Sequence, residues 1–292
     1  MADSYLERLA ARTASVGSVL CLGLDPDPAD VPRSLGRGLA GVERLASLIL
    51  EVGASSAAAV KANLAFFEAY GSGGIRALER LRGRTPAAIP FIADAKRGDV
   101  RSTATRQAVA LLDDLGADAV TLSPFLGRDA VEPFVARAGG FAYILCRTSN
   151  PGAGELQDLE VAADRELDAP AEPLWARVAR RAGTWDSGAR LGLVVGATAT
   201  RELAMARGIA PGLAFLVPGV GAQGGAVAPV LRHGRATGSP AGGRPGGGLL
   251  VNVSRGVSRA TADGRSPHAS RDLGERLAAA AGDWSARLAV LP

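Results

Sequence analysis

Residues 89–115 read IPFIADAKRGDVRSTATRQAVALLDDL, which is a short apolar run, a charged turn and a stretch with helical spacing. An apolar run without alternation is typical of a strand that is buried on both faces, as in parallel sheets. We expect a strand at 89–94 and a helix at 101–115. This order of strand, turn and helix predicts one parallel β/α unit.

The same order recurs along the chain of 292 residues. Apolar runs that predict strands lie at 18–24, 57–61, 89–94, 117–122, 140–145, 191–196, 213–217 and 248–253. Stretches with helical spacing lie at 40–55, 64–82, 101–115, 127–138, 172–183, 199–207, 224–232 and 270–288. Eight such units fit a closed barrel better than an open sheet. The predicted fold class is α/β, a TIM (β/α)₈ barrel, formed as a single domain by residues 1–292.

The composition is that of an ordinary globular protein, 47% hydrophobic and 21% charged, with a formal net charge of +4. Its 33 basic and 29 acidic residues are interspersed, whereas nucleic-acid-binding proteins usually gather their basic residues on one stripe. No apolar run approaches the roughly 18 residues that a transmembrane helix needs. We therefore expect no nucleic-acid partner and no membrane partner. The positive net charge suits a small anionic ligand.

Two features bear on the cellular compartment. The first residues, MADSYLERLAART, form a charged amphipathic pattern and lack the apolar core of a signal peptide. The two cysteines, Cys21 and Cys146, lie in separate apolar runs and do not form a disulfide framework. These features predict a cytoplasmic protein.

Three segments predict loops. Long connections after barrel strands usually shape or cover the site, so 146–170 and 218–226 are the expected lids. Residues 233–247, HGRATGSPAGGRPGG, are rich in glycine and proline and predict a flexible surface excursion before the last strand.

Charged residues gather where two predicted strands end. Asp94 and Lys96 lie two apart and should share the inner face of a regular strand, at the carboxyl end where barrel enzymes place their sites. Asp99 follows in the loop, and Lys61 ends the neighbouring strand. We expect an alternating array of Lys61, Asp94, Lys96 and Asp99 in a partly desolvated pocket.

This array has a structural and a functional interpretation. It could be a salt-bridge network that seals the barrel mouth, but buried ions destabilise a fold even when they are paired. Charged clusters with perturbed pKa values gather in active sites. The position of the array at the strand ends therefore favours the functional interpretation.

An anion site is predicted after the last two strands. The segment 217–225, VPGVGAQGG, opens a helix, and glycines there let backbone N–H groups approach a phosphate. The segment 252–256, NVSRG, brings Arg255 alongside. Phosphate sites formed by these two loops recur in (β/α)₈ barrels.

The same glycines also match the dinucleotide fingerprint GxGxxG. That interpretation needs an acidic residue roughly 20 positions further on, to hold a ribose hydroxyl. No Asp or Glu occurs between Leu203 and Ala262, which favours a phosphate dianion over NAD. His233 and His268 lie outside the predicted strand ends, and the lysines of the array would compete with a metal for its carboxylates. We expect no metal and no cofactor.

The segment 94–99, DAKRGD, resembles the DxKxxD signature of the orotidine 5′-phosphate decarboxylase family. Further segments resemble the family in the same order, and the resemblance spans roughly residues 5–290: LGLDP at 22–26, KANLAFFE at 61–68, VPGVGAQGG at 217–225 and NVSRG at 252–256. KANLAFFE, and CRTSNPGA at 146–153, are similar to the longer, bacterial type 2 branch.

The resemblance implies conversion of orotidine 5′-monophosphate (OMP) to UMP and CO₂, the last step of de novo pyrimidine biosynthesis. It implies that Lys96 donates the proton to C6 of the pyrimidine and that Asp94 lies against the substrate carboxylate. It also implies a homodimer in which Asp99 and Thr103 enter the site of the partner subunit. Further residues are implied to bind substrate: Asp25 and Lys61 at the ribose, Ser149 at the pyrimidine, Gln223 and Arg255 at the phosphate, together with Asn63 and Pro218.

Two alternatives stay open. Ketogulonate-phosphate decarboxylases and hexulose-phosphate synthases carry a similar DxKxxD but use Mg²⁺, and their acidic ligand after the second strand is replaced here by Asn63. A non-catalytic barrel that binds UMP but leaves OMP unchanged is the other alternative.

Overall fold

Eight parallel strands close into a barrel in the computed structural model, which describes residues 3–185, 189–221, 224–261 and 272–290. The strands are β1 (Leu20–Leu24), β2 (Ala59–Asn63), β3 (Phe91–Arg97), β4 (Ala119–Leu122), β5 (Phe141–Arg147), β8 (Leu191–Val195), β9 (Ala214–Pro218) and β10 (Leu249–Val253). Their order around the barrel is β1-β10-β9-β8-β5-β4-β3-β2. The expected (β/α)₈ barrel is confirmed, and each predicted strand overlaps one observed strand.

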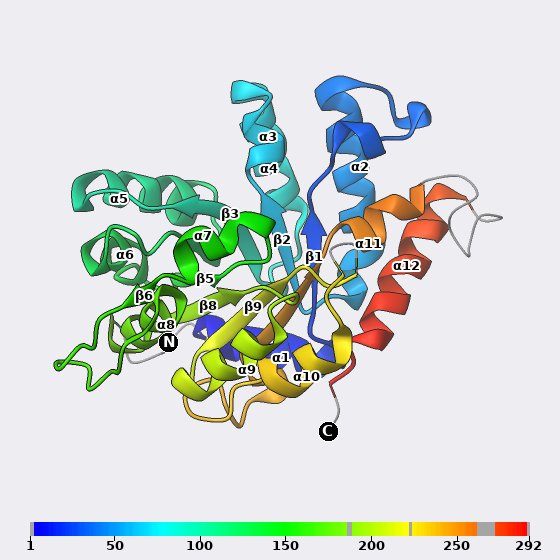
Figure 1. Ribbon diagram of the computed structural model, residues 1–292. Helices are drawn as coiled ribbons and strands as arrows, with labels where there is room; N and C mark the ends of the chain where they lie inside the picture. The colour runs from blue at the N-terminus through cyan, green and yellow to red at the C-terminus, as the bar shows by residue number, and fades with distance from the viewer. Residues whose placement is uncertain (1–2, 186–188, 222–223, 262–271, 291–292) are drawn as a thin grey trace.

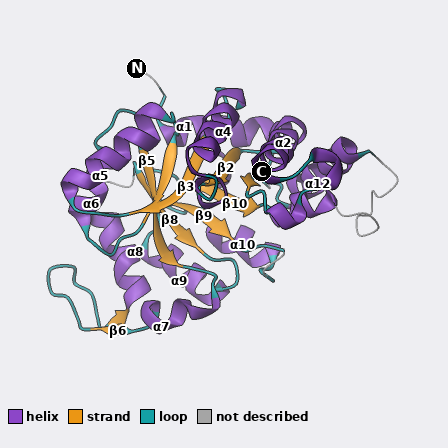
Figure 2. Ribbon diagram, turned by 90° about the horizontal axis from the view of Figure 1, so that it is seen from above, coloured by secondary structure: helices purple, strands orange, loops and turns teal. Residues whose placement is uncertain are grey.

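The helices surround the strands, as the view from above shows (Figure 2). They are α1 (Tyr5–Val16), α2 (Gly38–Gly53), α3 (Ala65–Glu68), α4 (Gly71–Arg84), α5 (Arg101–Ala108), α6 (Arg128–Val135), α7 (Gly154–Gln157), α8 (Leu174–Trp185), α9 (Thr200–Ile209), α10 (Val227–Gly234), α11 (Arg255–Ser258) and α12 (Leu273–Arg287). The predicted helix 64–82 is divided between α3 and α4, and 101–115 continues beyond α5 as a π-helical stretch, Val109–Asp114. None of the described helices has the length and apolar character needed to cross a membrane.

Helix α1 closes the amino-terminal end of the barrel (Figure 1). A capping box between Ser4 and Glu7 begins this helix, which satisfies N–H groups that would otherwise lack partners. The ring of Tyr5 stacks on Phe141 with the centroids 4.4 Å apart, and its hydroxyl lies 3.0 Å from that of Tyr143. Because this end is filled with side chains, a ligand can enter only at the carboxyl ends of the strands.

The prediction for residues 233–247 is wrong in one respect, because this segment packs against the barrel instead of extending into solvent. Ala241 is fully buried, and the Ala236 backbone N–H donates to the Gly247 carbonyl at 2.9 Å. Gly246 has a φ of 72°, and a Cβ there would lie 2.7 Å from Cγ2 of Thr13 in α1. Glycines make the segment look flexible in the sequence, but here they allow close packing beneath the barrel.

Candidate active site

A cavity of about 480 Å³ opens at the carboxyl ends of the barrel strands. Most of the residues predicted to bind or transform a substrate line it: Asp25, Lys61, Asn63, Asp94, Lys96, Ser149, Pro218 and Arg255. Asp99 and Thr103 are not among its lining residues, and Gln223 lies outside the described residues. The structure thus brings residues from six strand ends to one site.

A row of alternating charges crosses the cavity. The ammonium of Lys61 lies 2.7 Å from Oδ2 of Asp94 and 3.6 Å from Oδ1 of Asp25. The ammonium of Lys96 lies 2.6 Å from Oδ1 of Asp94. Within one chain the row is therefore Asp25, Lys61, Asp94 and Lys96: Asp25 extends it beside Lys61, at the end opposite to the one where the sequence analysis placed Asp99.

The two lysines of this row differ in exposure. The Lys61 side chain is 4% exposed, whereas that of Lys96 is 49% exposed. Strand β2 extends two residues beyond the predicted strand 57–61, so Lys61 lies inside the barrel wall and not at its rim. Lys61 is consequently fixed among carboxylates, and Lys96 is the lysine of the row that faces the open cavity.

The pKa values reflect this arrangement. Burial by itself would raise the pKa of Asp94, but the ammonium groups of Lys61 and Lys96 outweigh it and hold that pKa well below its ordinary value. Burial by itself would lower the pKa of Lys61, but the carboxylates of Asp25 and Asp94 raise it above its ordinary value. Lys61 and Asp94 therefore both remain charged throughout the neutral range.

Strand β3 is not regular where it reaches the cavity. Ala93 pairs with Val120 and Arg97 with Leu122, so residues 94–96 form a bulge opposite one residue of β4. Lys96 has a φ of 48°, a left-handed conformation that is uncommon for a residue with a side chain. Asp94 and Lys96 do both reach the cavity, but through a bulge and not through the plain alternation that the sequence predicted.

Sequence analysis missed Thr121, the residue of β4 opposite the bulge. Its hydroxyl lies 2.8 Å from Oδ1 of Asp94 and 3.0 Å from the backbone N of Lys96. The available signal was a polar residue inside the apolar run ADAVTL, residues 117–122. In this run the hydroxyl of Thr121 indicates a residue of the site, while the apolar residues around it indicate the strand.

Two more polar residues at the end of β10 hold Asp25. The Ser254 hydroxyl donates to Oδ2 of Asp25 at 2.6 Å, and the Asn252 amide donates to the Ser254 hydroxyl at 3.2 Å. Gly23 of β1 leaves room for this contact, because a Cβ there would lie 1.9 Å from the Ser254 hydroxyl oxygen. Both residues lie in the anion-site segment NVSRG, but the sequence gave neither of them a role.

The predicted anion end is formed by the loops after β9 and β10. Gly219, Val220, Arg255 and Gly256 line the cavity there. Gly219 has a φ of 98°, and its carbonyl accepts the Gly225 backbone N–H at 3.0 Å, which closes the loop. Glycine is required at this kind of turn because other residues rarely adopt such a φ.

Trp284 of α12 supports both of these loops from below. Its indole N–H donates to the Gly256 carbonyl at 3.2 Å. A Cβ on Gly221 would lie 2.8 Å from the indole ring, and one on Gly256 would lie 2.6 Å from Nε1. The sequence gave no indication of this support because α12 lies far along the chain from the first of the two loops.

The loop after β5 forms the wall on the other side. Thr148, Ser149, Asn150 and Gln157 line the cavity. The side-chain oxygen of Gln157 accepts the Thr148 backbone N–H at 2.9 Å, which ties α7 to the end of β5. The part of the lining contributed by Leu145, Val194 and Leu216 is apolar.

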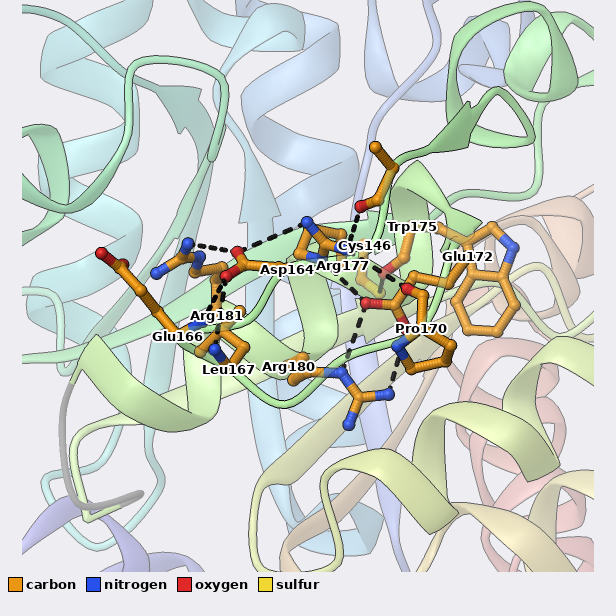
Figure 3. A network of polar contacts seen from close by, with 11 residues as sticks. Cys146, Asp164, Glu166, Leu167, Pro170, Glu172, Trp175, Arg177, Arg180 and Arg181 are labelled. Carbon is orange, nitrogen blue, oxygen red and sulfur yellow. Dashed lines mark hydrogen bonds and ion pairs between the residues drawn. The ribbon is translucent and has the colours of Figure 1, made fainter.

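Beyond this wall, the chain forms a small two-stranded excursion that is anchored to α8. Its strands are β6 (Glu160–Val161) and β7 (Glu172–Pro173). Glu172 is 7% exposed and accepts from Arg177 at 2.8 Å and from Arg180 at 3.0 Å (Figure 3). Asp164 accepts from Arg181 in the same network. The outer part of the expected lid 146–170 is thus held by ion pairs, whereas 148–157 is the part that lines the cavity.

Asp99 and Thr103 lie on the outer side of the barrel mouth. The Asp99 carboxylate accepts the Val100 backbone N–H at 2.7 Å, and Thr103 is exposed on α5. Val100, next to Asp99 in the chain, is 55% exposed, and Phe125 and Leu126, in the connection after β4, are 82% and 43% exposed. Exposed apolar side chains that gather in one patch are typical of a protein interface.

The sequence and the fold are similar to those of known proteins. A family model described as Orotidine 5′-phosphate decarboxylase / HUMPS family matches residues 18–266. The orotidine 5′-phosphate decarboxylase of Herpetosiphon aurantiacus is 41% identical over 272 residues, which cover 93% of this chain and 95% of that protein. The enzyme of the same name from Roseiflexus castenholzii is 44% identical over 275 residues, 94% of this chain and 96% of that protein.

Solved structures are similar over nearly the whole chain. The OMP decarboxylase of Leishmania donovani superposes with a TM-score of 0.75 at 36% identity, covering 96% of this chain and 99% of that one. The UMP synthase of Leishmania donovani superposes with a TM-score of 0.78 at 36% identity. That match covers 97% of this chain but only 56% of the longer synthase.

Proposed function

We propose that this chain, which belongs to the Orotidine 5′-phosphate decarboxylase / HUMPS family, converts OMP to UMP and CO₂ in pyrimidine biosynthesis. The observation that carries the proposal is the charged row at the barrel mouth, in which Lys96 and Asp94 are 2.6 Å apart and open to the cavity. Relatives that carry the decarboxylase name and match 93% and 94% of the chain support it.

The cavity offers a place for each part of OMP. Gly219 and Arg255 would bind the phosphate, with Gln223 as a further proposed contact. Asp25 and Lys61 would bind the ribose hydroxyls, and Ser149 the pyrimidine edge. Asn63 and Pro218 complete the proposed substrate contacts.

The reacting carbon would then face Lys96 and Asp94. The bond between C6 and the carboxylate breaks, CO₂ leaves, and the electron pair remains on C6 in the plane of the ring. The Lys96 ammonium stabilises that charge electrostatically and then gives its proton to C6. Asp94 would lie against the substrate carboxylate, and the repulsion between them disappears as CO₂ departs.

The phosphate contacts supply binding energy at a distance from the reacting carbon. An enzyme can use such energy to close loops and to align the substrate. The residues nearest the cavity in the loops after β5 and β9 are the parts we expect to close over OMP. Alignment of C6 with the Lys96 ammonium is the step that this closure would serve.

The working enzyme is proposed to be a homodimer. Asp99 and Thr103 do not line the cavity of their own chain, and the apolar side chains of Val100, Phe125 and Leu126 are exposed. Pairing of two chains that covers these side chains would bring Asp99 and Thr103 to the partner's site.

Two broader proposals accompany this one. We propose that residues 1–292 form a single domain, because the described residues build one closed barrel. We also propose that the protein works in the cytoplasm. Cys21 and Cys146 are free and buried, as thiols usually are in a reducing compartment.

The test is to incubate the purified protein with OMP and excess EDTA and to follow the ultraviolet change as UMP forms. Turnover in EDTA is the expected result, because the proposed mechanism uses only side chains. A protein that binds UMP but leaves OMP unchanged would contradict the proposal. Turnover that EDTA abolishes would indicate the Mg²⁺-dependent chemistry of the sugar-phosphate members of the superfamily instead.

A further inference from the structure

Thr121 lies where β4 faces the bulge of β3. The three residues 94–96 of β3 stand opposite Thr121 alone, because pairing resumes only between Arg97 and Leu122. Thr121 is 1% exposed, so water has little access to its hydroxyl. The side chain is therefore enclosed between the two functional residues that the bulge presents.

Chemistry fixes the direction of both hydrogen bonds of this hydroxyl. An ionised carboxylate can only accept, so Thr121 donates its single proton to Oδ1 of Asp94, at 2.8 Å. The backbone N–H of Lys96 can only donate, so it donates to the Thr121 hydroxyl oxygen, at 3.0 Å. One hydroxyl thus links the Asp94 carboxylate to the Lys96 backbone.

Both linked groups depend on this support. The left-handed turn at Lys96 is a conformation that persists only where its surroundings hold it. The Lys96 side chain is half-exposed, so few neighbouring side chains hold it in place. The backbone conformation at Lys96 therefore sets where its ammonium lies relative to Asp94. Oδ1 of Asp94 accepts both from this ammonium and from Thr121, whereas Oδ2 accepts from Lys61.

We propose that Thr121 is a positioning residue of the decarboxylation site, which holds the Asp94 carboxylate and the Lys96 ammonium in the relative orientation that proton delivery to C6 requires. This inference rests on the proposed function. In the described part of the chain, Thr121 forms its hydrogen bonds with Asp94 and Lys96, and none with Arg255 or Asp25 at the proposed phosphate and ribose ends of the cavity. Its loss should therefore appear in turnover and not in the binding of product.

The experiment compares Thr121→Val, which keeps the side-chain shape and removes the hydroxyl, with the unmodified enzyme. We expect kcat for OMP to fall about 10- to 100-fold, because the reacting groups lose their alignment. KM for OMP and Kd for UMP should stay within about 3-fold of the wild-type values. The contacts that bind substrate and transition state equally are retained in this variant. Thr121→Ser retains the hydroxyl and should restore kcat to within about 3-fold of wild type.

Thr85→Val is the matched control. Thr85 is 5% exposed, and its hydroxyl donates to the Leu81 carbonyl at the end of α4, outside the cavity lining. This variant also loses a buried hydroxyl but should keep the wild-type kcat. Thr121→Ala should show the same loss of kcat as Thr121→Val. If the valine variant does not fold, kcat of the alanine variant tests the inference in its place.

The outcomes separate the inference from the proposed function. Absence of OMP turnover by the unmodified protein would overturn the proposed function, and the inference with it. If the unmodified protein is active, a normal kcat in Thr121→Val would overturn the inference alone. An equal loss of kcat in Thr121→Ser or in Thr85→Val would do the same, because the hydroxyl would then not be responsible.

Discussion

Asp94 receives more donors than any other residue of the charged row. Lys61 donates to its Oδ2, while Lys96 and Thr121 both donate to its Oδ1. A buried carboxylate with this set of partners is strongly favoured in its ionised form. Asp94 therefore works as a fixed negative charge, and the proton for C6 must come from a neighbouring group.

The depressed pKa of Asp94 makes a prediction about stability and pH. A carboxyl group whose folded pKa lies below its unfolded value stabilises the fold above the unfolded pKa, about 3.9 for Asp, and loses that contribution as pH falls. The Asp94→Asn variant should unfold more easily than wild type at pH 7. The difference in the free energy of unfolding should be constant down to about pH 5 and shrink below about pH 4.

Urea denaturation of both proteins at pH 3, 5 and 7 would measure this difference. In wild type Lys61 stays protonated over this range, because the carboxylates of Asp25 and Asp94 outweigh its burial and raise its pKa. In Asp94→Asn the carboxylate of Asp25 remains beside the Lys61 ammonium. A difference that widens in acid would show that Asp94 is not held in its ionised form by the lysines.

Among the elements, helix α12 supports two loops of the site through Trp284. Trp284 contacts the loops after β9 and β10 together, and its N–H donates to the Gly256 carbonyl. Supports of this kind keep ligand-binding groups in register although they never touch the ligand. The phosphate end of the cavity thus depends on a helix near the end of the chain.

The prediction for this element concerns phosphate binding. Trp284→Phe removes the N–H and should weaken UMP binding about 10-fold, the lower range for loss of such a support. Binding of uridine, which lacks the phosphate, should change much less. Calorimetric titration with both ligands would measure the two effects, and Trp185→Phe on α8 is the matched control. Equal weakening of UMP and uridine binding would contradict a specific role at the phosphate end.

The elements also show what the sequence could and could not reveal. The strands were predictable because parallel barrel strands are apolar on both faces. Lys61, Asp94 and Lys96 were predictable because they follow or end such runs, whereas Asp25 came from the family resemblance. The bulge of β3 was not predictable, because apolar patterning carries no signal for a local change of register. The role of Trp284 could not be predicted either, since it arises from contacts between segments that are distant in the chain.

For the molecule as a whole, one chain is expected to be insufficient. The cavity of a single chain lacks Asp99 and Thr103, and the apolar side chains of Val100, Phe125 and Leu126 are exposed. The position of Asp99 outside the row allows a direct experiment on shared sites.

Mixing two inactive variants tests the shared site. If Asp99 acts in the partner's site, a mixed dimer of Lys96→Ala and Asp99→Ala has one complete site. After exchange of subunits the mixture should recover about a quarter of the wild-type specific activity, because half of the dimers are mixed. A mixture of Lys96→Ala with Asp94→Ala should stay inactive, because each residue acts in the site of its own chain and both sites of a mixed dimer therefore lack one of them. Failure of the first mixture to recover would contradict the trans arrangement.

The most direct test of the central claim is the turnover of OMP by Lys96→Ala at saturating substrate, measured beside its affinity for UMP. Our account predicts that kcat falls by about 10³-fold or more, because both the charge beside C6 and its proton are lost. UMP should still bind, since Arg255 and Asp25 are untouched. A variant that binds UMP and turns over OMP at close to the wild-type rate would contradict the assignment of Lys96.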